Sequence, residues 1–213
     1  MATGTDENLP IITEFAQKLG VAANDVVAPY ANAEGFVVGD GSVSILLEEE
    51  EYAKARGAKV YCYALGFGHG RKNVKFGKLV GSDEALDKAI ADALADAGIA
   101  AADVDAVCGF ANGCKKIDDI EKGALQRVFG EKLATMPLFE VKERTGEGRA
   151  GSAALAAAEA ALLLSGEMAN DSAYYVAADG SVSAKTAESA NLKKILVISY
   201  ATGGSYSAVV FGK

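Results

Sequence analysis

The chain has 213 residues, of which 50% are hydrophobic and 23% are charged. This composition excludes a disordered chain, because the apolar content is enough to build a core. The formal net charge of −8 argues against nucleic-acid binding, which depends on a basic surface. A single histidine excludes any mechanism that needs two from this chain.

The thiols and the apolar segments bear on the compartment. Cys62, Cys108 and Cys114 form no CxxC pair, and an odd number of thiols fits a reducing environment. The first residues have neither the basic start nor the apolar segment of a secretory signal. The most apolar stretch, Ala150–Ser165, is too short to span a bilayer. We therefore expect a soluble, cytoplasmic protein, and no motif indicates a metal or a cofactor.

The first quarter of the chain predicts two helices and two or three strands. Asn8–Gly20 carries apolar residues at helical spacing and ends on glycine, which predicts a short helix. Gly35–Glu48 has two β-branched runs around a glycine-rich segment, which predicts two strands joined by a tight turn. Glu48–Arg56 is charged and predicts an exposed helix, and Lys59–Gly66 alternates as a strand does.

The middle of the chain alternates between helical and strand patterns. Ser82 is a favourable N-cap for a helix that reaches Gly98, because apolar residues recur there at helical spacing. Strands are predicted at Val104–Phe110 and Pro137–Val141, with a helix at Asp118–Val128 between them. This alternation predicts an α/β fold.

Gly148–Gly166 is nearly uncharged and is built mainly from small residues. A helix that is apolar on all sides is a buried helix, and small side chains let neighbouring elements approach closely. Two further strands are predicted, at Ile195–Ser199 and Tyr206–Phe211, around a glycine-containing turn.

Four segments share motifs with one family. Pro29–Gly57 is similar to a GFVxGEG turn followed by a hydrophobic strand and an LEExxxAxxRGA helix. Ala93–Asp105, Val141–Ala154 and Ser199–Phe211 are similar to a helix-to-strand passage, a KsxxGH loop and an SFGFGG turn. These segments resemble the β-ketoacyl-(acyl carrier protein) synthases, which are condensing enzymes of the thiolase fold. The resemblance implies the C-terminal part of that fold, a mixed β-sheet layered with α-helices.

The resemblance also divides the chain. Residues 1–57 would be the tail of the N-terminal half of a ketosynthase, with a helix, a hairpin and a helix. Residues 58–213 would be the C-terminal domain. The opening segment, Ala2–Glu7, resembles the strand end that follows the nucleophile helix of the family. It implies that the family's cysteine nucleophile belongs upstream of this chain.

The departures from the family motifs concern the active site. The family has one histidine in AHGTxT and another in KsxxGH, with a supporting lysine in the second motif. By the resemblance, these three positions are Asn112, Glu147 and Lys142, so the lysine is kept and both histidines are replaced. The D-x-x-E that follows the first motif remains as Asp118 and Glu121.

The replacements bear directly on the chemistry of the family. Its two imidazoles donate hydrogen bonds to the malonyl thioester carbonyl and stabilise the enolate that forms as carbon dioxide leaves. Asn112 can still donate, whereas a Glu147 carboxylate can only accept, and its charge opposes an enolate. A protonated Glu147 could donate, but this requires a strongly raised pKa. We therefore expect the usual decarboxylative route to be disabled.

Several of these residues have a structural interpretation beside the functional one. Lys142 and Glu147 could form a buried ion pair that fixes their loop. Thr202, Gly203 and Gly204 match the family's gating turn and are candidate substrate-binding residues. The two glycines could instead permit a tight entry into the last strand.

The histidine and the cysteines match no catalytic motif. We interpret His69, in a glycine-rich loop, as a surface or structural residue. Cys114 occupies the place of a family threonine near the active site, where a nucleophile would be new to the family. Cys62 and Cys108 lie on predicted strands and are interpreted as small core residues.

We predict a non-catalytic, ketosynthase-like subunit of a fatty-acid or polyketide condensing complex. It resembles the chain-length factors, in which a degenerate ketosynthase pairs with an active one and shapes the acyl cavity. One alternative is an acyltransferase or condensing enzyme completed by a cysteine on a partner chain, and another is a structural scaffold. Without the nucleophile and both histidines, the chain is expected to be inactive alone.

The helix at Gly148–Leu164 predicts a partner. In the thiolase fold it would lie between two sheets, and here most of the second sheet is missing. One face would then be exposed as an apolar patch of a kind that soluble monomers avoid. We expect a ketosynthase-like partner chain that supplies the N-terminal half, an acyl carrier protein as a further partner, and neither nucleic acid nor a membrane.

Overall fold

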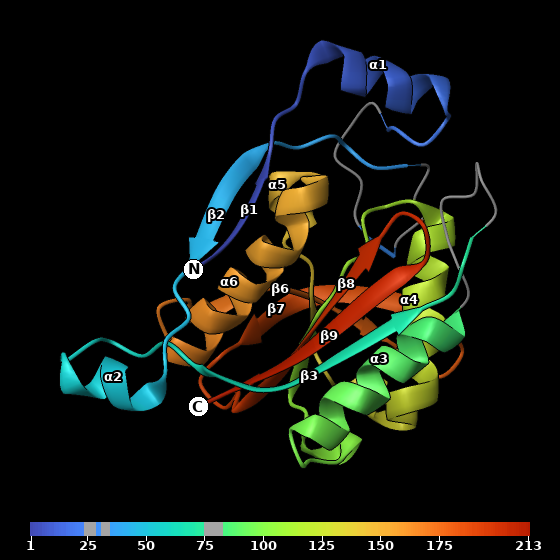
Figure 1. Ribbon diagram of the computed structural model, residues 1–213. Coiled ribbons are helices and arrows are strands. Elements are labelled where there is room, and N and C mark those ends of the chain that lie inside the picture. The colour runs from blue at the N-terminus through green and yellow to red at the C-terminus, as the bar shows by residue number, and fades with distance from the viewer. Residues whose placement is uncertain (24–28, 31–34, 75–82) are drawn as a thin grey trace.

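The computed structural model describes residues 1–23, 29–30, 35–74 and 83–213 (Figure 1). The strands are β1 (Ala2–Asp6), β2 (Gly41–Ile45), β3 (Tyr63–Arg71), β4 (Ala106–Cys108), β5 (Leu138–Phe139), β6 (Asn170–Val176), β7 (Val182–Glu188), β8 (Lys194–Ala201) and β9 (Ser205–Gly212). The α-helices are α1 (Pro10–Lys18), α2 (Glu50–Ala55), α3 (Asp83–Asp96), α4 (Lys115–Phe129), α5 (Lys142–Thr145) and α6 (Ser152–Ser165). Short 3₁₀ turns, η1 to η3, cover Ala101–Asp103, Gly130–Ala134 and Arg149–Gly151.

Seven strands form one mixed sheet in the order β3-β9-β8-β4-β5-β6-β7. Its centre is parallel, because β4 pairs in parallel with both β8 and β5. The outer pairs are antiparallel, including the β6–β7 hairpin at one edge and the β3–β9 pair at the other. The mixed sheet with flanking helices confirms the predicted α/β class.

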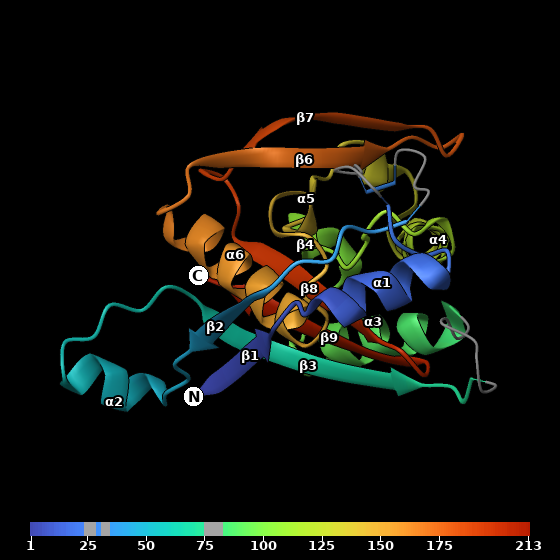
Figure 2. The same ribbon diagram turned by 90° about the horizontal axis from the view of Figure 1, so that it is seen from above.

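The helices cover the two faces of this sheet unequally. Helices α3 and α4 pack against one face, and α6 packs against the other along β8 and β4 (Figures 1 and 2). The two-stranded sheet of β1 and β2 lies on the far side of α6. The layers are therefore α3 and α4, the large sheet, α6, and the small sheet.

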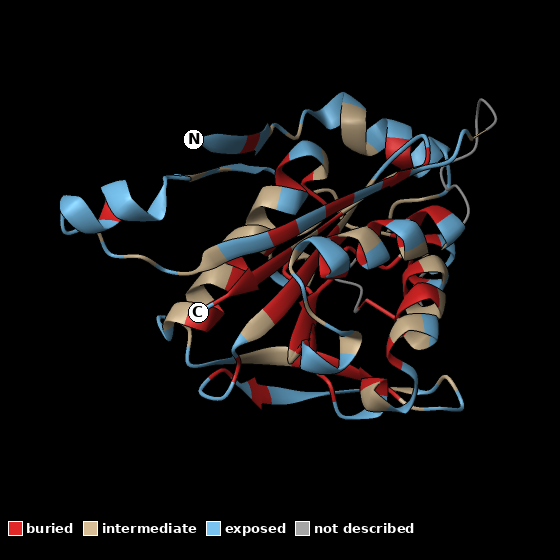
Figure 3. Cartoon of the chain, turned by 60° about the horizontal axis from the view of Figure 1, so that its bottom comes forward, coloured by how far each residue is buried: buried red, intermediate tan, exposed pale blue. Residues whose placement is uncertain are grey.

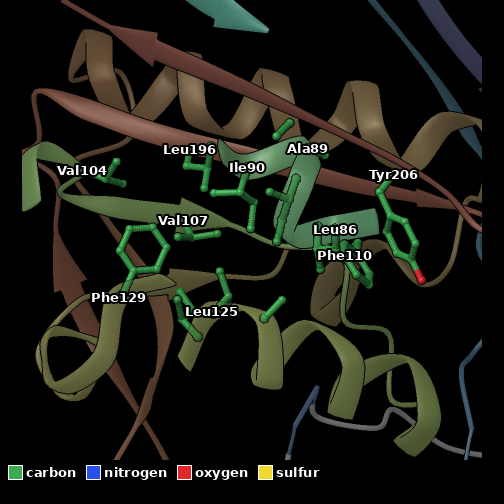
Figure 4. Close-up of a cluster of buried hydrophobic side chains, with 14 of the residues drawn as sticks. Leu86, Ala89, Ile90, Val104, Val107, Phe110, Leu125, Phe129, Leu196 and Tyr206 are labelled. Atoms are coloured by element: carbon green, nitrogen blue, oxygen red, sulfur yellow. The ribbon is translucent and has the colours of Figure 1, made fainter. Parts of the chain in front are cut away.

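Buried apolar side chains fill the space between the sheet and its helices. On the α3 and α4 side, Ile90 and Leu125 pack with Val107 of β4, and all three are completely buried (Figure 4). On the α6 side, Leu163 and Ile195 belong to a second buried cluster. The sheet is thus apolar on both faces, as strands in the middle of a layered α/β fold must be.

The segment Gly66–Gly70 is a strand and not the loop that the glycines predicted. It forms part of β3, where Gly66, Gly68 and Gly70 alternate with exposed residues. A Cβ on Gly68 would lie 2.0 Å from the carbonyl oxygen of Ala89, so the strand can touch the backbone of α3 only without side chains. His69 therefore lies on the exposed face of a strand.

The predicted hairpin within Gly35–Glu48 is also wrong. Residues Gly41–Ile45 form β2, but this strand pairs antiparallel with β1. The preceding run makes isolated bridges instead, with Phe36 next to Ala22 and Val38 next to Glu147. The glycine-rich segment therefore passes between two separate partners, and it brings the N-terminal part of the chain against the loop of Glu147.

The helix α6 is covered on both sides, contrary to the predicted exposed face. It contacts β8 and β4 on one side and β1 and β2 on the other. Among its described residues only Ala153 is exposed. The small side chains allow this: a Cβ on Gly4 of β1 would lie 2.9 Å from the Cβ of Ala154. The central position of the helix is thus confirmed, and exposed apolar surface lies elsewhere.

Helices α1 and α2 are mostly exposed (Figure 3). The large exposed apolar side chains include residues of the N-terminal elements and of β3. On α1, Ile11 and Phe15 are 67% and 60% exposed, and on β3 Phe67 is 55% exposed. Leu46 and Leu47, which follow β2, are 66% and 58% exposed. We call the surface made by these five residues and Leu19 the apolar rim.

The remaining predicted elements are present with small shifts of their ends. The N-cap predicted at Ser82 lies outside the described residues. The β6–β7 hairpin was not predicted, although Asp179-Gly180 between two β-rich runs is a strong hairpin signal. Within the described part of the chain, no helix combines the length and the apolar character needed to cross a bilayer.

Candidate functional site

The three residues that the resemblance assigns to the family's catalytic positions lie together. Asn112 follows β4, Lys142 begins α5, and Glu147 lies between α5 and η3. The Asn112 amide donates to Glu147 Oε2 over 2.8 Å, and Lys142 Nζ lies 3.0 Å from the same oxygen. Lys142 also donates to the carbonyl of Phe110 at 2.7 Å. The predicted buried ion pair is therefore present.

Each of the two carboxylate oxygens of Glu147 has two donors. Oε2 accepts from Asn112 and Lys142, as described above. Oε1 accepts from the backbone N–H of Arg149 at 2.7 Å and from the hydroxyl of Ser152 at 2.8 Å. A carboxylate with two donors on each oxygen has no remaining need for a proton.

These contacts fix the ionisation state of Glu147. Burial opposes its charge, but the Lys142 ammonium and the hydrogen bonds from Asn112 and Ser152 outweigh burial and lower its pKa below the ordinary value of 4.5. The side chain is therefore an anion at neutral pH. A protonated Glu147, the one form that could donate to a substrate carbonyl, is excluded by its surroundings.

A second set of buried acids holds the loop around Asn112. Asp118 accepts from the backbone N–H of Asn112 and from that of Tyr30, both at 2.9 Å. Glu121 accepts from the backbone N–H of Phe110 at 2.9 Å. The D-x-x-E pair of the motif thus positions backbone and does not face the Glu147 carboxylate.

Glu121 shares its space with another buried acid, Glu140. A Cβ on Gly109 would lie within 2.2 Å of a carboxylate oxygen of each, so the two carboxyls meet over this glycine. The Tyr30 hydroxyl donates to Glu140 Oε1 at 2.5 Å. Burial is the main reason that the pKa of Glu121 is raised to about 8, and that of Glu140 is raised as well. The pair is therefore protonated in part at neutral pH.

An apolar cavity of about 460 Å³ opens beside the Asn112–Glu147 contact. The volume is in the range of small-molecule sites. Its apolar wall is made by residues of α1 and the segment after it, the 36–38 segment, the segment after β4, α4, η3, α6 and β8: Ile12, Phe15, Ala16, Leu19, Val21, Phe36, Val38, Phe110, Ile117, Ala150, Ala153 and Ile198. Asn112, Lys142 and Glu147 form its polar end, so the site joins an apolar chamber to a neutralised ion pair.

The candidate substrate-binding turn divides between two roles. Thr202 lines the cavity, and its predicted substrate binding stays a prediction. The N–H of Gly204 donates to the carbonyl of Ala201 within the β8–β9 turn, and its own carbonyl accepts from Lys72. Gly203 and Gly204 have φ angles of 108° and 82°, which fits the alternative of a tight strand entry.

Of the other sequence candidates, Cys114 adjoins this centre, and none of the others contacts Asn112, Lys142 or Glu147 through a hydrogen bond among the described residues. Cys114 is the N-cap residue of α4 and is half-buried, and its N–H donates to the Asn112 side chain. Cys108 is fully buried in β4, and Cys62 is half-buried one residue before β3. His69 Nε2 lies 2.9 Å from the hydroxyl of Ser205 on the neighbouring strand. The interpretation of Cys108 as a core residue is confirmed.

Several residues of the site were not singled out from the sequence. Tyr30 and Glu140 complete the acid group at Gly109, and Arg149 lines the cavity while binding Asp6 of β1. Their signal was weak, since the sequence does not show that residues about 110 positions apart meet. Glu159, the one charged residue of α6, was the clearest signal, because a charge in an otherwise uncharged buried helix needs a partner.

The site can bind an apolar ligand, but it is poorly equipped to stabilise negative charge. Glu147 is itself an anion, Lys142 is neutralised by it, and the Arg149 guanidinium, which also lines the cavity, is paired with Asp6. No group of acidic, histidine and cysteine side chains that could hold a metal occurs among the described residues. Acid–base catalysis near neutral pH by Asn112 is excluded, because an amide does not titrate in that range.

Fold and site residues together define a domain with the thiolase-like fold of the ketosynthases. Residues 61–175 match the family described as beta-ketoacyl synthase, C-terminal domain. This match covers more than half of the chain, and the chain belongs to that family.

Individual relatives agree with this assignment. The chain is 34% identical over 128 residues to 3-oxoacyl-[acyl-carrier-protein] synthase 2 of Rhizobium meliloti, covering 58% of this chain and 30% of that one. A structure titled the ishigamide ketosynthase/chain length factor superposes with a TM-score of 0.84 at 23% identity, covering 99% of this chain and 53% of that one.

A third relative was solved as a complex. AntDE:AntF, described as a type II PKS acyl-carrier protein with its ketosynthase bound to the hexaketide, superposes with a TM-score of 0.80 at 21% identity. The superposition covers 98% of this chain and 54% of that one. The chain thus spans about half the length, or less, of the relatives that it matches.

Proposed function

We propose that the chain is a non-catalytic ketosynthase-like subunit that shapes an acyl pocket, in the manner of a chain-length factor. One observation carries the proposal: Glu147, at the position of a family histidine, is an anion whose four hydrogen bonds all come from its own protein. The site keeps the ketosynthase architecture without the groups that decarboxylate malonyl thioesters.

The energetic argument concerns the enolate. Decarboxylation places negative charge on the thioester oxygen, and catalysis needs donors or cations directed at that oxygen. In this site Glu147 is a carboxylate. The Lys142 cation is held 3.0 Å from its Oε2 atom and 2.7 Å from the carbonyl oxygen of Phe110. Relocating the cation toward a substrate would leave a buried carboxylate unpaired, which is unfavourable.

The cavity supports the second part of the proposal. Its wall is apolar, and its polar end is neutral overall, as suits an acyl chain whose thioester lies at the mouth. The titles of two structural relatives name a chain length factor and an acyl-carrier protein complex. We therefore propose a fatty-acid or polyketide acyl chain as the occupant and an acyl carrier protein as the partner that delivers it.

The apolar rim supports a protein partner. Ile11, Phe15, Leu46 and Phe67 are each more than half exposed, and large apolar side chains exposed in this number favour an interaction site. We propose that a ketosynthase-like partner chain covers it and completes the thiolase fold. In this proposal residues 1–57 act as the end of an N-terminal half, and residues 58–213 act as the C-terminal domain.

The test of the catalytic claim is carbon dioxide release from a malonyl thioester of acyl carrier protein. The chain is assayed with the ketosynthase-like protein that co-purifies with it, with that partner's own catalytic cysteine replaced by alanine. We expect release at the background rate. The variant N112H/E147H restores two imidazoles and is expected to raise the rate, while N112H alone, which keeps the anion, is not.

The contrary result is release above background that falls in N112A and E147Q. That outcome would make this site catalytic and would favour an enzyme completed by a cysteine on another chain. Light scattering of the purified chain tests the partner separately. We expect a hetero-oligomer, and a monomer that does not bind an apolar dye would overturn the assignment of the apolar rim.

A further inference from the structure

A buried group of one arginine and two carboxyls beside α6 has no part in the proposed function. Arg144 of α5 directs its guanidinium between Glu159 of α6 and Asp171 of β6. Nη2 donates to Glu159 Oε1 and Nη1 donates to Asp171 Oδ1, each at 2.5 Å. Glu159 is 2% exposed and the Asp171 side chain 12%, whereas Arg144 reaches the surface.

Charges and donors do not balance if both carboxyls are ionised. One cation then faces two anions. The second oxygens, Glu159 Oε2 and Asp171 Oδ2, are both buried and have no hydrogen-bond partner among the described residues. Two buried acceptors without a donor are unfavourable, and each such atom in a native structure needs an explanation.

Among the described residues, no further cation is found next to Glu159. The charged or titratable groups that face Glu159 are Arg144 from α5, Asp171 from β6 and the thiol of Cys108 from β4. Burial and the nearby carboxyls raise the pKa of Cys108, so its thiol stays neutral. Burial also raises the pKa of Glu159 to about 7, against the effect of Arg144 and helped by the facing Asp171 carboxyl.

We propose that Glu159 carries a proton on Oε2 and donates it as a hydrogen bond to Asp171 Oδ2, and that this proton makes the junction of α6 with β6 sensitive to pH. A single hydrogen gives both orphaned oxygens a partner. It also leaves one negative charge opposite the single Arg144 cation. The junction is then neutral and every buried polar atom in it is satisfied.

The sign of the pH dependence follows from the raised pKa. Between the ordinary value of 4.5 and about 7, the folded state holds a proton that the unfolded state has lost. Stability therefore falls as pH rises through this window and stays level above it. One proton makes the unfolding equilibrium constant grow by up to tenfold per pH unit. The affected element is the β6–β7 hairpin at the sheet edge (Figure 2).

The test is the pH dependence of urea unfolding of the full chain, compared with E159Q and D171N. Each amide can donate a hydrogen to the remaining carboxylate while its oxygen still accepts from Arg144, so each mimics this proton permanently. We expect both variants to lose the extra pH dependence between pH 5 and 7. Their unfolding constants should differ from the wild type progressively more toward pH 7. The pH response of Glu121 is present in all three proteins and cancels in the comparison.

Two further measurements serve as controls for this test. The double variant E159Q/D171N leaves Arg144 without any anion and should be less stable than either single variant at every pH. In the unmodified chain, amide exchange corrected for its intrinsic pH dependence should accelerate in β6 and β7 between pH 5.5 and 7.5, and not in β4. The proposal would be overturned if each variant, E159Q or D171N, were destabilised by the same amount at pH 5 as at pH 8. It would also be overturned if the corrected exchange rates in the hairpin did not change with pH.

Discussion

The short helix α5 directs two cations into two buried acidic sites, and the two sites differ in the number of hydrogen-bond donors that their carboxylate oxygens receive. Lys142 meets Glu147, a carboxylate whose two oxygens receive four hydrogen bonds. Arg144 meets Glu159 and Asp171, of whose four oxygens two are left without a donor. Both glutamates are buried, with exposed fractions of 9% for Glu147 and 2% for Glu159. The pKa of Glu147 is nevertheless lowered, and that of Glu159 is raised to about 7.

The comparison shows that burial alone does not set the ionisation state of a carboxyl. Donors decide it, because each hydrogen bond to the charged form favours that form. In the Glu147 site the donors come from three segments that the fold brings together. The same arrangement that fixes the anion there makes the site unsuitable for enolate chemistry. The Glu159 site can instead take up and release a proton.

The largest expected effect is the loss of the Glu147 anion. E147Q keeps the shape but leaves Lys142 buried without its charge partner, so we expect a loss of about 3–5 kcal/mol in the free energy of unfolding. Urea unfolding at pH 7 measures it. The matched control is K142M/E147L, which removes both charges and should be less destabilised than either K142M or E147L. If E147Q had the same free energy of unfolding as the unmodified chain, the ion pair would not be needed for stability.

Removal of the other cation is expected to have a smaller effect. R144M takes one donor from each of two buried carboxyls, but the Arg144 side chain is 41% exposed, and Glu159 can respond by staying protonated. We expect a loss of about 1–3 kcal/mol at pH 7. A loss as large as that of E147Q would mean that both sites are ordinary ion pairs, and the contrast between them would disappear.

The acid group at Gly109 predicts a pH response that reaches further into the alkaline range. Glu121 has its pKa raised to about 8, so the folded state holds a proton up to that pH and stability falls as pH approaches 8 from below. E121Q should remove this slope, which amounts to at most about 1.4 kcal/mol per pH unit. Unfolding midpoints at pH 6, 7 and 8 measure it, and an unchanged slope in E121Q would assign the response to another group.

The smallest effect is expected at the surface. Lys115 and Asp119 form an exposed pair on α4, with side chains 73% and 46% exposed. K115A should change the free energy of unfolding by no more than about 0.5 kcal/mol, because solvent screens the pair. This variant serves as the reference for the buried sites, and a loss of 2 kcal/mol there would make the larger values uninformative about burial.

The fold could be predicted where local pattern and motif agreed. Apolar spacing placed α1, α3 and α4, and the small residues of α6 correctly indicated a central helix. The pattern failed where tertiary contacts overrule it. Gly66, Gly68 and Gly70 indicate a loop locally, and only the approach of α3 explains why they form a strand. Likewise, β2 pairs with β1, which is distant in the chain, and the local pattern around β2 does not show this.

The site was predictable in its residues but not in its state. The motifs brought Asn112, Lys142 and Glu147 together and left two interpretations of Glu147 open, a protonated donor and an ion-paired anion. The choice depended on Arg149 and Ser152, which no motif connects to it. Glu140 and Tyr30 belong to segments whose meeting only the folded chain shows.

The central claim is that Glu147 is an anion at neutral pH, held by Lys142, Asn112 and Ser152. Carbon NMR of the chain labelled at the glutamate side-chain carboxyl tests it most directly, with E147Q and E159Q used to assign the two resonances. The account predicts that the Glu147 resonance titrates with a midpoint below the ordinary value of 4.5, while that of Glu159 titrates near pH 7. A Glu147 resonance that titrates at or above pH 7 would contradict the account, because the side chain could then donate a proton to a substrate.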